Sequence, residues 1–235
     1  MPSNLPELVT HPALPLAHRL LPPRIQAGAS GAPCLILLHG VGANEINLID
    51  VAQRLDPRLL VILSRGPLFF GPAQFGWFNV SFATGRPEIN AQQAEQSRAL
   101  LAQFIAGLPA AYGVDSERIW IAGFSQGGIM SASVGLTRPD LVAGFGILSG
   151  RILPEIAPLT AANEQTRKLS AFISHGTGDG KLTVEFARGA KRLLEQKEVQ
   201  LDYHEYDAEH ELNATMQRDL GAWLQQQLEA DQDRA

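Results

Sequence analysis

The sequence predicts an α/β fold in which helices cover both faces of a mostly parallel central sheet. Two observations lead to this prediction. Apolar, strand-like runs alternate with helical patterns along the chain, without a composition break or an internal repeat, and such alternation is typical of a parallel sheet covered on both sides. One of these runs, Cys34-Leu35-Ile36-Leu37-Leu38, is continuously apolar, as expected for a central strand that is buried on both faces.

The predicted elements follow in a regular order. An edge strand is expected within residues 14–21 and should end at the proline pair 22–23, because proline interrupts strand pairing. Further strands are expected near 33–38, 59–64, 118–123, 142–148, 169–174 and 199–206. Helices are expected near 45–55, 90–112, 127–137, 181–197 and 211–229, two of which (90–112 and 211–229) carry apolar side chains on one face.

The length of the chain fits one domain. A chain of 235 residues buries a substantial core and still forms a single α/β unit. We assign residues 31–235 to this domain, and residues 1–30 to an N-terminal segment of the same domain.

A serine stands at the sharpest predicted turn. Gly123-Phe124-Ser125-Gln126-Gly127 follows the strand-like run near 118–123 and precedes a helical run. In this strand-turn-helix context a serine is held in a strained conformation with its hydroxyl exposed, which is typical of a catalytic nucleophile. Glycine is expected at 123 and 127 because side chains there would collide across the turn.

The residues that would activate this serine occur downstream in the required order. Asp179 lies in a glycine-rich loop after the strand near 169–174, and His210 lies in the loop between the strand near 199–206 and the last helix. The order Ser, Asp, His on loops after strands is the order of this design. His210 would take the proton of Ser125, and Asp179 would orient the imidazole and stabilise its charged form. Asp202 and Asp207 are alternative acids, although they lie on or beside the strand that precedes His210.

The loop His39-Gly40-Val41-Gly42 follows the buried strand near 33–38. We assign the oxyanion hole to the backbone amides of Val41 and Gln126, the second being the residue after the nucleophile. His39 and His175, each directly after a strand, are expected to shape the loops that they begin.

Six motifs stand in order along the chain: LILLHGVG at 35–42, RGPL at 65–68, GWFN at 76–79, GFSQGG at 123–128, HGTGD at 175–179 and AEHEL at 208–212. Together they resemble the phospholipase/carboxylesterase family, which includes bacterial carboxylesterases and acyl-protein thioesterases. The resemblance covers residues 33–228 and implies an α/β-hydrolase fold without a large cap domain. It implies the same three catalytic residues, Ser125, Asp179 and His210. Two positions depart from the family pattern: Glu209 precedes the histidine in place of glycine, and Gly180-Lys181-Leu182-Thr183 follows the acid in place of an apolar-proline stretch.

The loop 65–89 is rich in aromatic residues, and its glycines and prolines are expected to break any regular element. These rings either form a small cluster packed under the loop or an apolar wall beside Ser125 that binds the acyl group; the two interpretations are compatible. The resemblance places GWFN near the serine, so Trp77 is the first candidate for contact with substrate. The other candidates are Phe70, Phe75 and Phe78.

Composition limits the environment and the partners. The net charge of −5 argues against nucleic acid as a partner, and no cluster has metal-ligand spacing, so neither a metal nor another cofactor is expected. The single cysteine, Cys34, excludes an internal disulfide and fits a reducing compartment. Without a secretory signal or a membrane-spanning stretch, we expect a cytoplasmic protein that does not insert stably in membranes. A homodimer is an expectation from the family alone.

These observations predict a serine hydrolase that cleaves carboxylic esters, with short-to-medium acyl chains, through an acyl-enzyme. The substrate would be a small ester or an acylated molecule. A thioesterase with the same triad is one alternative, because the same chemistry cleaves both bonds. An alternative of another class is a hydrolase-fold binding protein that has lost turnover.

Overall fold

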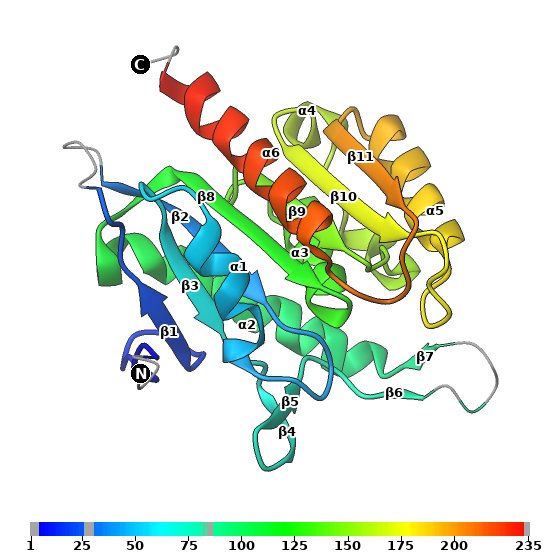
Figure 1. Ribbon diagram of the computed structural model, residues 1–235, viewed down its shortest axis with the longest axis horizontal. Helices are drawn as coiled ribbons and strands as arrows, with labels where there is room; N and C mark the ends of the chain where they lie inside the picture. The colour runs from blue at the N-terminus through cyan, green and yellow to red at the C-terminus, as the bar shows by residue number, and fades with distance from the viewer. Residues whose placement is uncertain (1–4, 26–30, 82, 84–86, 233–235) are drawn as a thin grey trace.

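The computed structural model describes residues 5–25, 31–81, 83 and 87–232. Within these residues the largest sheet has seven strands in the order β1-β3-β2-β8-β9-β10-β11 (Figure 1). The strands are β1 (His18–Leu21), β2 (Ala32–Leu38), β3 (Leu60–Ser64), β8 (Val114–Phe124), β9 (Gly144–Leu148), β10 (Ser170–Gly176) and β11 (Gln200–Tyr206). All neighbours pair in parallel except β1, which runs antiparallel to β3 at the edge.

Helices cover both faces of this sheet, and the side chains of β2 show why. Cys34, Ile36 and Leu38 belong to one apolar core, whereas Leu35 and Leu37 belong to a second core on the opposite face, because successive strand residues point to opposite sides. The first core lies under α2 (Ala91–Tyr112), α3 (Gln126–Thr137) and α5 (Val184–Gln196), and the second under α1 (Ile49–Arg54) and α6 (Ala214–Gln232). The predicted α/β fold with a mostly parallel sheet is therefore confirmed.

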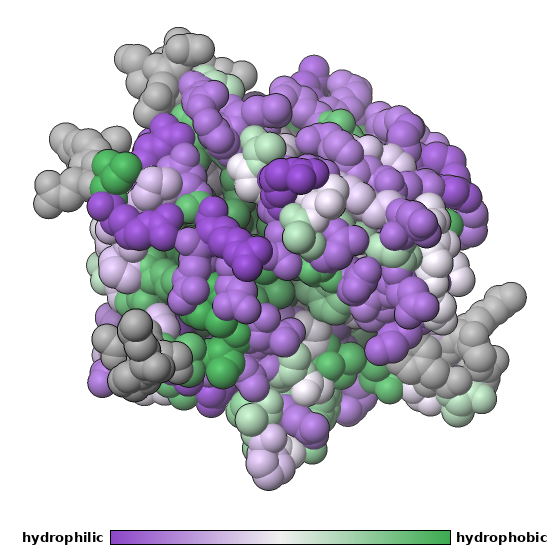
Figure 2. All heavy atoms as spheres, viewed as in Figure 1, coloured by the Kyte–Doolittle hydropathy of each residue, from purple (hydrophilic) through white to green (hydrophobic). Residues whose placement is uncertain are grey.

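α6 illustrates how an amphipathic helix is placed. Leu220, Trp223, Leu224 and Leu228 pack against the sheet, and the helix crosses the front of the sheet in Figure 1. The surface on this side of the molecule is mainly hydrophilic where α6 runs (Figure 2). No helix of the described ranges is long and apolar enough to cross a membrane.

The loop 65–89 differs from the prediction that it lacks regular structure. It contains two short hairpins, one from β4 (Leu68–Gly71) and β5 (Gln74–Gly76), the other from β6 (Val80–Ser81) and β7 (Glu88–Ile89). Glycine and proline did not prevent pairing because Gly71 and Ala73 take positive φ angles in the turn that joins β4 to β5, which lets the chain reverse within two residues. Phe82, another aromatic residue of this loop, lies outside the described residues.

Short elements complete the chain: the 3₁₀ helices η1 (Glu45–Leu48) and η2 (Pro154–Leu159), and the helix α4 (Asn163–Thr166). The predicted helix near 45–55 is in fact η1 followed by α1. β2, β8, β10 and β11 end at the same edge of the sheet and are followed there by His39, Ser125, Thr177 and Asp207. Loops at the carboxyl ends of parallel strands form the ligand sites of such sheets.

Candidate active site

Ser125 lies between the end of β8 and the start of α3 with φ 54° and ψ −115°, a conformation that non-glycine residues rarely adopt. The turn is tight because backbones cross it closely. A Cβ atom on Gly127 would lie 2.1 Å from the Leu38 carbonyl oxygen, and one on Gly123 would lie 2.4 Å from the Gly127 carbonyl carbon. The Ser125 amide donates to the Leu148 carbonyl oxygen at 2.7 Å. The strained serine is thus fixed to the neighbouring strand β9.

The three residues singled out from the sequence form one hydrogen-bonded line. The Ser125 Oγ atom lies 3.0 Å from His210 Nε2, and His210 Nδ1 lies 2.6 Å from Asp179 Oδ2. A carboxylate accepts only, so Nδ1 of His210 carries the proton and Nε2 accepts from the Ser125 hydroxyl. In this arrangement the imidazole is ready to take the serine proton. Asp202, an alternative acid in the sequence, instead contacts His204 at 2.7 Å.

The segment that departs from the family pattern holds the acid. The amides of Lys181 and Leu182 both donate to Asp179 Oδ1 at 2.8 Å, while Oδ2 faces His210. Any residues except proline at 181 and 182 provide these two donors, so the departure leaves the support of Asp179 intact. The other departure, Glu209, is exposed, as is Glu211 on the far side of the histidine.

The buried side chain of His175 connects the two ends of the Asp179 loop. Its Nε2 lies 2.6 Å from the Leu182 carbonyl oxygen, which only accepts, and 3.4 Å from Asp179 Oδ2. The Nε2 atom therefore carries the proton. Burial lowers the pKa of His175, which favours the neutral ring. The ring is thus a structural donor that joins the two ends of the loop, in agreement with the expectation from the sequence.

The amides assigned to the oxyanion hole are available. In the described part of the chain neither the Val41 nor the Gln126 backbone N–H has an intramolecular acceptor. The peptide group between Gly40 and Val41 is held by its carbonyl oxygen, which accepts from His39 Nδ1 at 2.7 Å and from the Ala43 amide at 3.3 Å. In a trans peptide the N–H points opposite to the C=O, so these bonds fix the direction of the Val41 amide.

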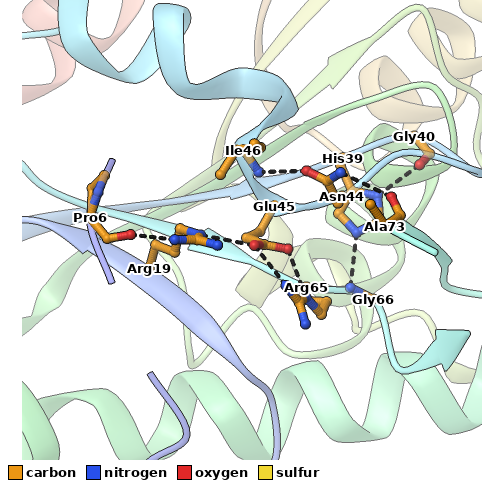
Figure 3. A network of polar contacts seen from close by, with 10 residues as sticks. All are labelled: Pro6, Arg19, His39, Gly40, Asn44, Glu45, Ile46, Arg65, Gly66 and Ala73. Carbon is orange, nitrogen blue, oxygen red and sulfur yellow. Dashed lines mark hydrogen bonds and ion pairs between the residues drawn. The ribbon is translucent and has the colours of Figure 1, made fainter. Parts of the chain in front are cut away.

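The tautomer of His39 follows from its second contact. The Gly66 amide donates to His39 Nε2 at 3.0 Å (Figure 3), so Nε2 is the acceptor and the proton resides on Nδ1, facing Gly40. Burial lowers the pKa of His39, which keeps the ring neutral. A protonated ring would direct an N–H at the Gly66 N–H.

A buried charge braces the same loop (Figure 3). Glu45, 3% exposed, accepts two bonds from Arg65 at 2.7 and 2.8 Å and one from Arg19 at 2.9 Å. Burial alone would raise the pKa of Glu45, but the hydrogen bonds from Arg65 and Arg19 outweigh it and lower the pKa to about 2. The carboxylate therefore stays charged and ties η1, next to the oxyanion loop, to β1 and the segment after β3.

Trp77 does not meet the expectation of a substrate-facing ring. It is 0% exposed, and its indole N–H donates to the His39 carbonyl oxygen at 3.0 Å. The Gln126 side chain holds the adjoining backbone, because its Oε1 accepts from the Trp77 amide and its Nε2 donates to the Phe78 carbonyl oxygen, both at 2.7 Å. The expectation was wrong because an indole that satisfies its N–H on the oxyanion loop is more stable inside than at the surface.

The remaining aromatic candidates divide into two groups. Phe78 lines the cavity beside Ser125. Phe70 and Phe75 are not among the residues that line it: Phe75 packs under the Arg65 guanidinium at 4.4 Å, and Phe70 lies against Gly76, where an added Cβ would meet its ring at 2.5 Å. The Phe75 backbone has another role, since it pairs with Gly42 and Ala43 of the oxyanion loop.

A cavity of about 530 Å³ opens beside the triad, within the range of about 300–1,000 Å³ that is typical of small-molecule sites. Most of its wall is apolar, and much of that wall comes from the loop 65–89. Its lining residues include Phe78, Val80, Pro87, Ile89, Ile129, Arg151, Lys181 and Leu182. The expectation of an apolar wall from the loop 65–89 thus holds for Phe78, Val80, Pro87 and Ile89, and the alternative of a packed cluster holds for Trp77.

Sequence reasoning missed the Gln126 side chain and Arg151. The only sequence signal for Gln126 is its place in GFSQGG, which indicates a role for its backbone amide and not for its side chain. Arg151 lies in the loop after β9, which carries no residue of the triad, and the sequence around Arg151 contains no motif that indicates a functional residue.

Comparison with known proteins agrees with this geometry. The sequence model of the Phospholipase/Carboxylesterase family matches residues 23–228. Acyl-protein thioesterase 1 of Mycosarcoma maydis is 30% identical over 232 residues, covering 87% of this chain and 95% of the relative. A probable carboxylesterase of Oryza sativa subsp. japonica is 23% identical, covering 93% and 87%.

Solved structures share the fold. A carboxylesterase from Mesorhizobium loti superposes with a TM-score of 0.79 at 22% identity, covering 94% of this chain and 99% of that chain. The Bacillus cereus carboxylesterase gives a TM-score of 0.77 at 22% identity, covering 90% and 94%. The prediction of an α/β-hydrolase fold is confirmed.

Proposed function

Because the chain belongs to the phospholipase/carboxylesterase family and is a carboxylic ester hydrolase, we propose that Ser125, His210 and Asp179 are its catalytic triad. The observation that supports this assignment is the hydrogen-bonded line from Ser125 Oγ through the imidazole to Asp179, with contacts of 3.0 and 2.6 Å.

The proposed reaction proceeds through an acyl-enzyme. The Ser125 hydroxyl attacks the carbonyl carbon of the ester while its proton passes to His210 Nε2, and Asp179 stabilises the resulting imidazolium. The tetrahedral intermediate collapses and expels the alcohol, which takes the proton back from His210. Water then repeats the sequence on the acyl-enzyme and releases the acid.

The negative charge of each intermediate falls on the former carbonyl oxygen. The Val41 and Gln126 amides, which have no other acceptor in the described residues, would donate to this oxygen. Amides held in place before the reaction stabilise such a charge without reorganisation, and loss of one donor typically costs about 10²–10³ in rate. The bonds that His39 and the Ala43 amide make to Gly40 keep the first of these donors in place.

The proposed substrates are esters with short-to-medium acyl chains, since the cavity is mostly apolar and about 530 Å³ in volume. Thioester cleavage is a second candidate. It is favoured by the relative with 30% identity, which is an acyl-protein thioesterase. A ratio of kcat/KM on p-nitrophenyl esters of increasing length to kcat/KM on an S-acyl substrate separates the two.

The decisive test is labelling with a fluorophosphonate probe together with ester hydrolysis. Wild type should be labelled, and Ser125→Ala should lose labelling and lose kcat by on the order of 10⁶-fold. Ser133→Ala is the matched control, because this serine lies on the same helix and its hydroxyl donates to the Ile129 carbonyl oxygen of that helix, away from the triad. Absence of labelling in folded wild type would favour a binding protein without turnover. Full activity of Ser125→Ala would remove the mechanism.

We further propose that the enzyme acts in the cytoplasm as a homodimer, and that residues 1–30 belong to the same domain as residues 31–235. The lone, buried Cys34 is compatible with a reducing compartment, and the pairing of β1 with β3 supports the domain assignment. Cell fractionation, light scattering and limited proteolysis test these three points separately.

A further inference from the structure

Among the residues that the structure describes, two cations line this mostly apolar cavity, and they differ in environment. Lys181 is exposed, whereas Arg151 is half-buried between the segment before β7 and helix α5. No aspartate or glutamate is found among the described residues that line the cavity. The side of the cavity near Arg151 is therefore positively charged within a wall of low polarity.

The backbone that carries Arg151 lies beside the nucleophile turn, and the Arg151 side chain lines the same cavity as Ser125. Arg151 follows Gly150, where an added Cβ would lie 3.1 Å from the Ser125 carbonyl oxygen. Its guanidinium carbon stands 5.1 Å from the centre of the Phe186 ring. Its Nη2 reaches the Pro87 carbonyl oxygen at a distance of 3.5 Å, which is at the outer limit of a hydrogen bond.

The protein leaves most donors of this guanidinium unused. An arginine has five N–H donors, yet Nε is buried without a partner, and in the described part of the chain no carboxylate forms an ion pair with Arg151. Burial lowers the pKa of Arg151, and the charge of Glu155 opposes this. Buried charges are normally paired because removing them from water is costly. The partly buried arginines of β1 and of the segment after β3 follow this rule, since Arg19 and Arg65 both pair with Glu45.

We propose that Arg151 recognises an anionic group, a carboxylate or a phosphate, carried by the ester substrate. The guanidinium fork matches the two oxygens of such a group, and the bound anion would supply the partner that the protein lacks. The anion stands either on the acyl part, as in a monoester of a dicarboxylic acid, or on the alcohol part. This inference rests on the proposed function because the group must be attached to an ester that reaches Ser125.

Two matched pairs of esters test the proposal. Monoethyl adipate and ethyl hexanoate differ by an anion on the acyl side, and hexanoyl-glycerol phosphate and hexanoylglycerol differ by an anion on the alcohol side. For each pair the ratio of kcat/KM, anionic over neutral, is measured in wild type, Arg151→Met, Arg151→Lys and Lys181→Met. The neutral ester reports folding and the triad in every variant.

In Arg151→Met we expect this ratio to fall about 10- to 100-fold for one pair, because charge-assisted hydrogen bonds contribute about 1.5–3 kcal/mol and 1.4 kcal/mol is tenfold. Arg151→Lys should retain part of the ratio. Lys181→Met should change it less, since that cation is solvated. The pair that responds identifies the side that carries the anion. Arg138→Met is the control: this arginine stands at the opposite end of α3 from Ser125, about 20 Å away, and its replacement should leave all rates unchanged.

A second measurement needs no variant. With ethyl hexanoate as substrate, adipate or glycerol phosphate should inhibit the unaltered enzyme competitively at lower concentration than hexanol, and added salt should weaken this inhibition. Equal ratios in wild type and Arg151→Met for both pairs, or equal inhibition by neutral and anionic compounds, would overturn the inference while leaving the esterase intact. If wild type hydrolyses none of the four esters, the proposed function fails, and this inference fails with it.

Discussion

The Gln126 side chain provides a prediction whose magnitude follows from its contacts. This amide, 3% exposed, joins the nucleophile turn to the Trp77-Phe78 backbone through two bonds of 2.7 Å. In Gln126→Leu a buried N–H and a buried C=O lose their partners. Each unsatisfied group costs about 1–3 kcal/mol, so the free energy of unfolding should fall by about 2–6 kcal/mol, out of the 5–15 kcal/mol that is typical of proteins.

Gln126→Glu separates the loss of hydrogen bonds from the loss of shape. The new carboxylate still accepts from the Trp77 amide, but its second oxygen faces the Phe78 carbonyl oxygen. Only the protonated form donates there, so folding raises the pKa of the introduced group. The folded state then binds more protons than the unfolded state above pH about 4.3, and stability relative to wild type falls as pH rises.

Urea unfolding at pH 5 and pH 8, each referred to wild type at the same pH, measures both effects. Gln126→Leu should show a similar deficit at the two pH values, and Gln126→Glu a smaller deficit at pH 5. Activity should fall with stability because Phe78 lines the cavity. A loss below about 0.5 kcal/mol for Gln126→Leu, the size of an ordinary surface substitution, would show that the bridge to the Trp77-Phe78 backbone is not part of the support of the site.

Two further predictions concern acid stability and the tight turn. Burial lowers the pKa of His18, His39 and His175, so the unfolded state binds more protons than the folded state below pH about 6.5. The free energy of unfolding should therefore fall as pH falls through that value, by up to about 1.4 kcal/mol per pH unit for each histidine. Urea midpoints that are unchanged between pH 7.5 and pH 5.5 would contradict this. Gly127→Ala should lower the free energy of unfolding by at least about 1–3 kcal/mol, because its Cβ would lie 2.1 Å from the Leu38 carbonyl oxygen. Gly189→Ala in α5 should instead stabilise the protein by about 0.5–1 kcal/mol, because the nearest atom is the end of the Arg192 side chain at 3.7 Å. Thermal unfolding of the two variants, measured side by side, tests both predictions.

The sequence was most informative where a residue directly follows a strand. Period and apolar run length predicted the strands of the large sheet within a few residues. Because the loop after the strand near 33–38 and the turn after the strand near 118–123 both follow strands, the amides of Val41 and Gln126 could be assigned to one oxyanion hole before any distance was known. The loop 65–89 was harder to predict, since strands of two to four residues have too few positions for a pattern to emerge. The burial of Trp77 depends on a carbonyl group of His39, which lies far away in the sequence.

Arg151 could have been predicted as a cavity residue if the strand order had been known. Its own neighbours in the sequence carry no catalytic signal, but β9 pairs with β8, and the loop after β9 therefore lies against the turn that presents Ser125. Arg151 stands 26 positions after the serine (151 against 125). It lines the cavity because of the strand order, which hydrophobic patterning does not predict. The order Ser, Asp, His on loops after strands can be recognised along the chain, so the triad could be assigned without knowledge of the strand order. The residues that line the substrate cavity depend on which strands are neighbours in the sheet. For this reason the sequence predicts the type of reaction better than it predicts the substrate.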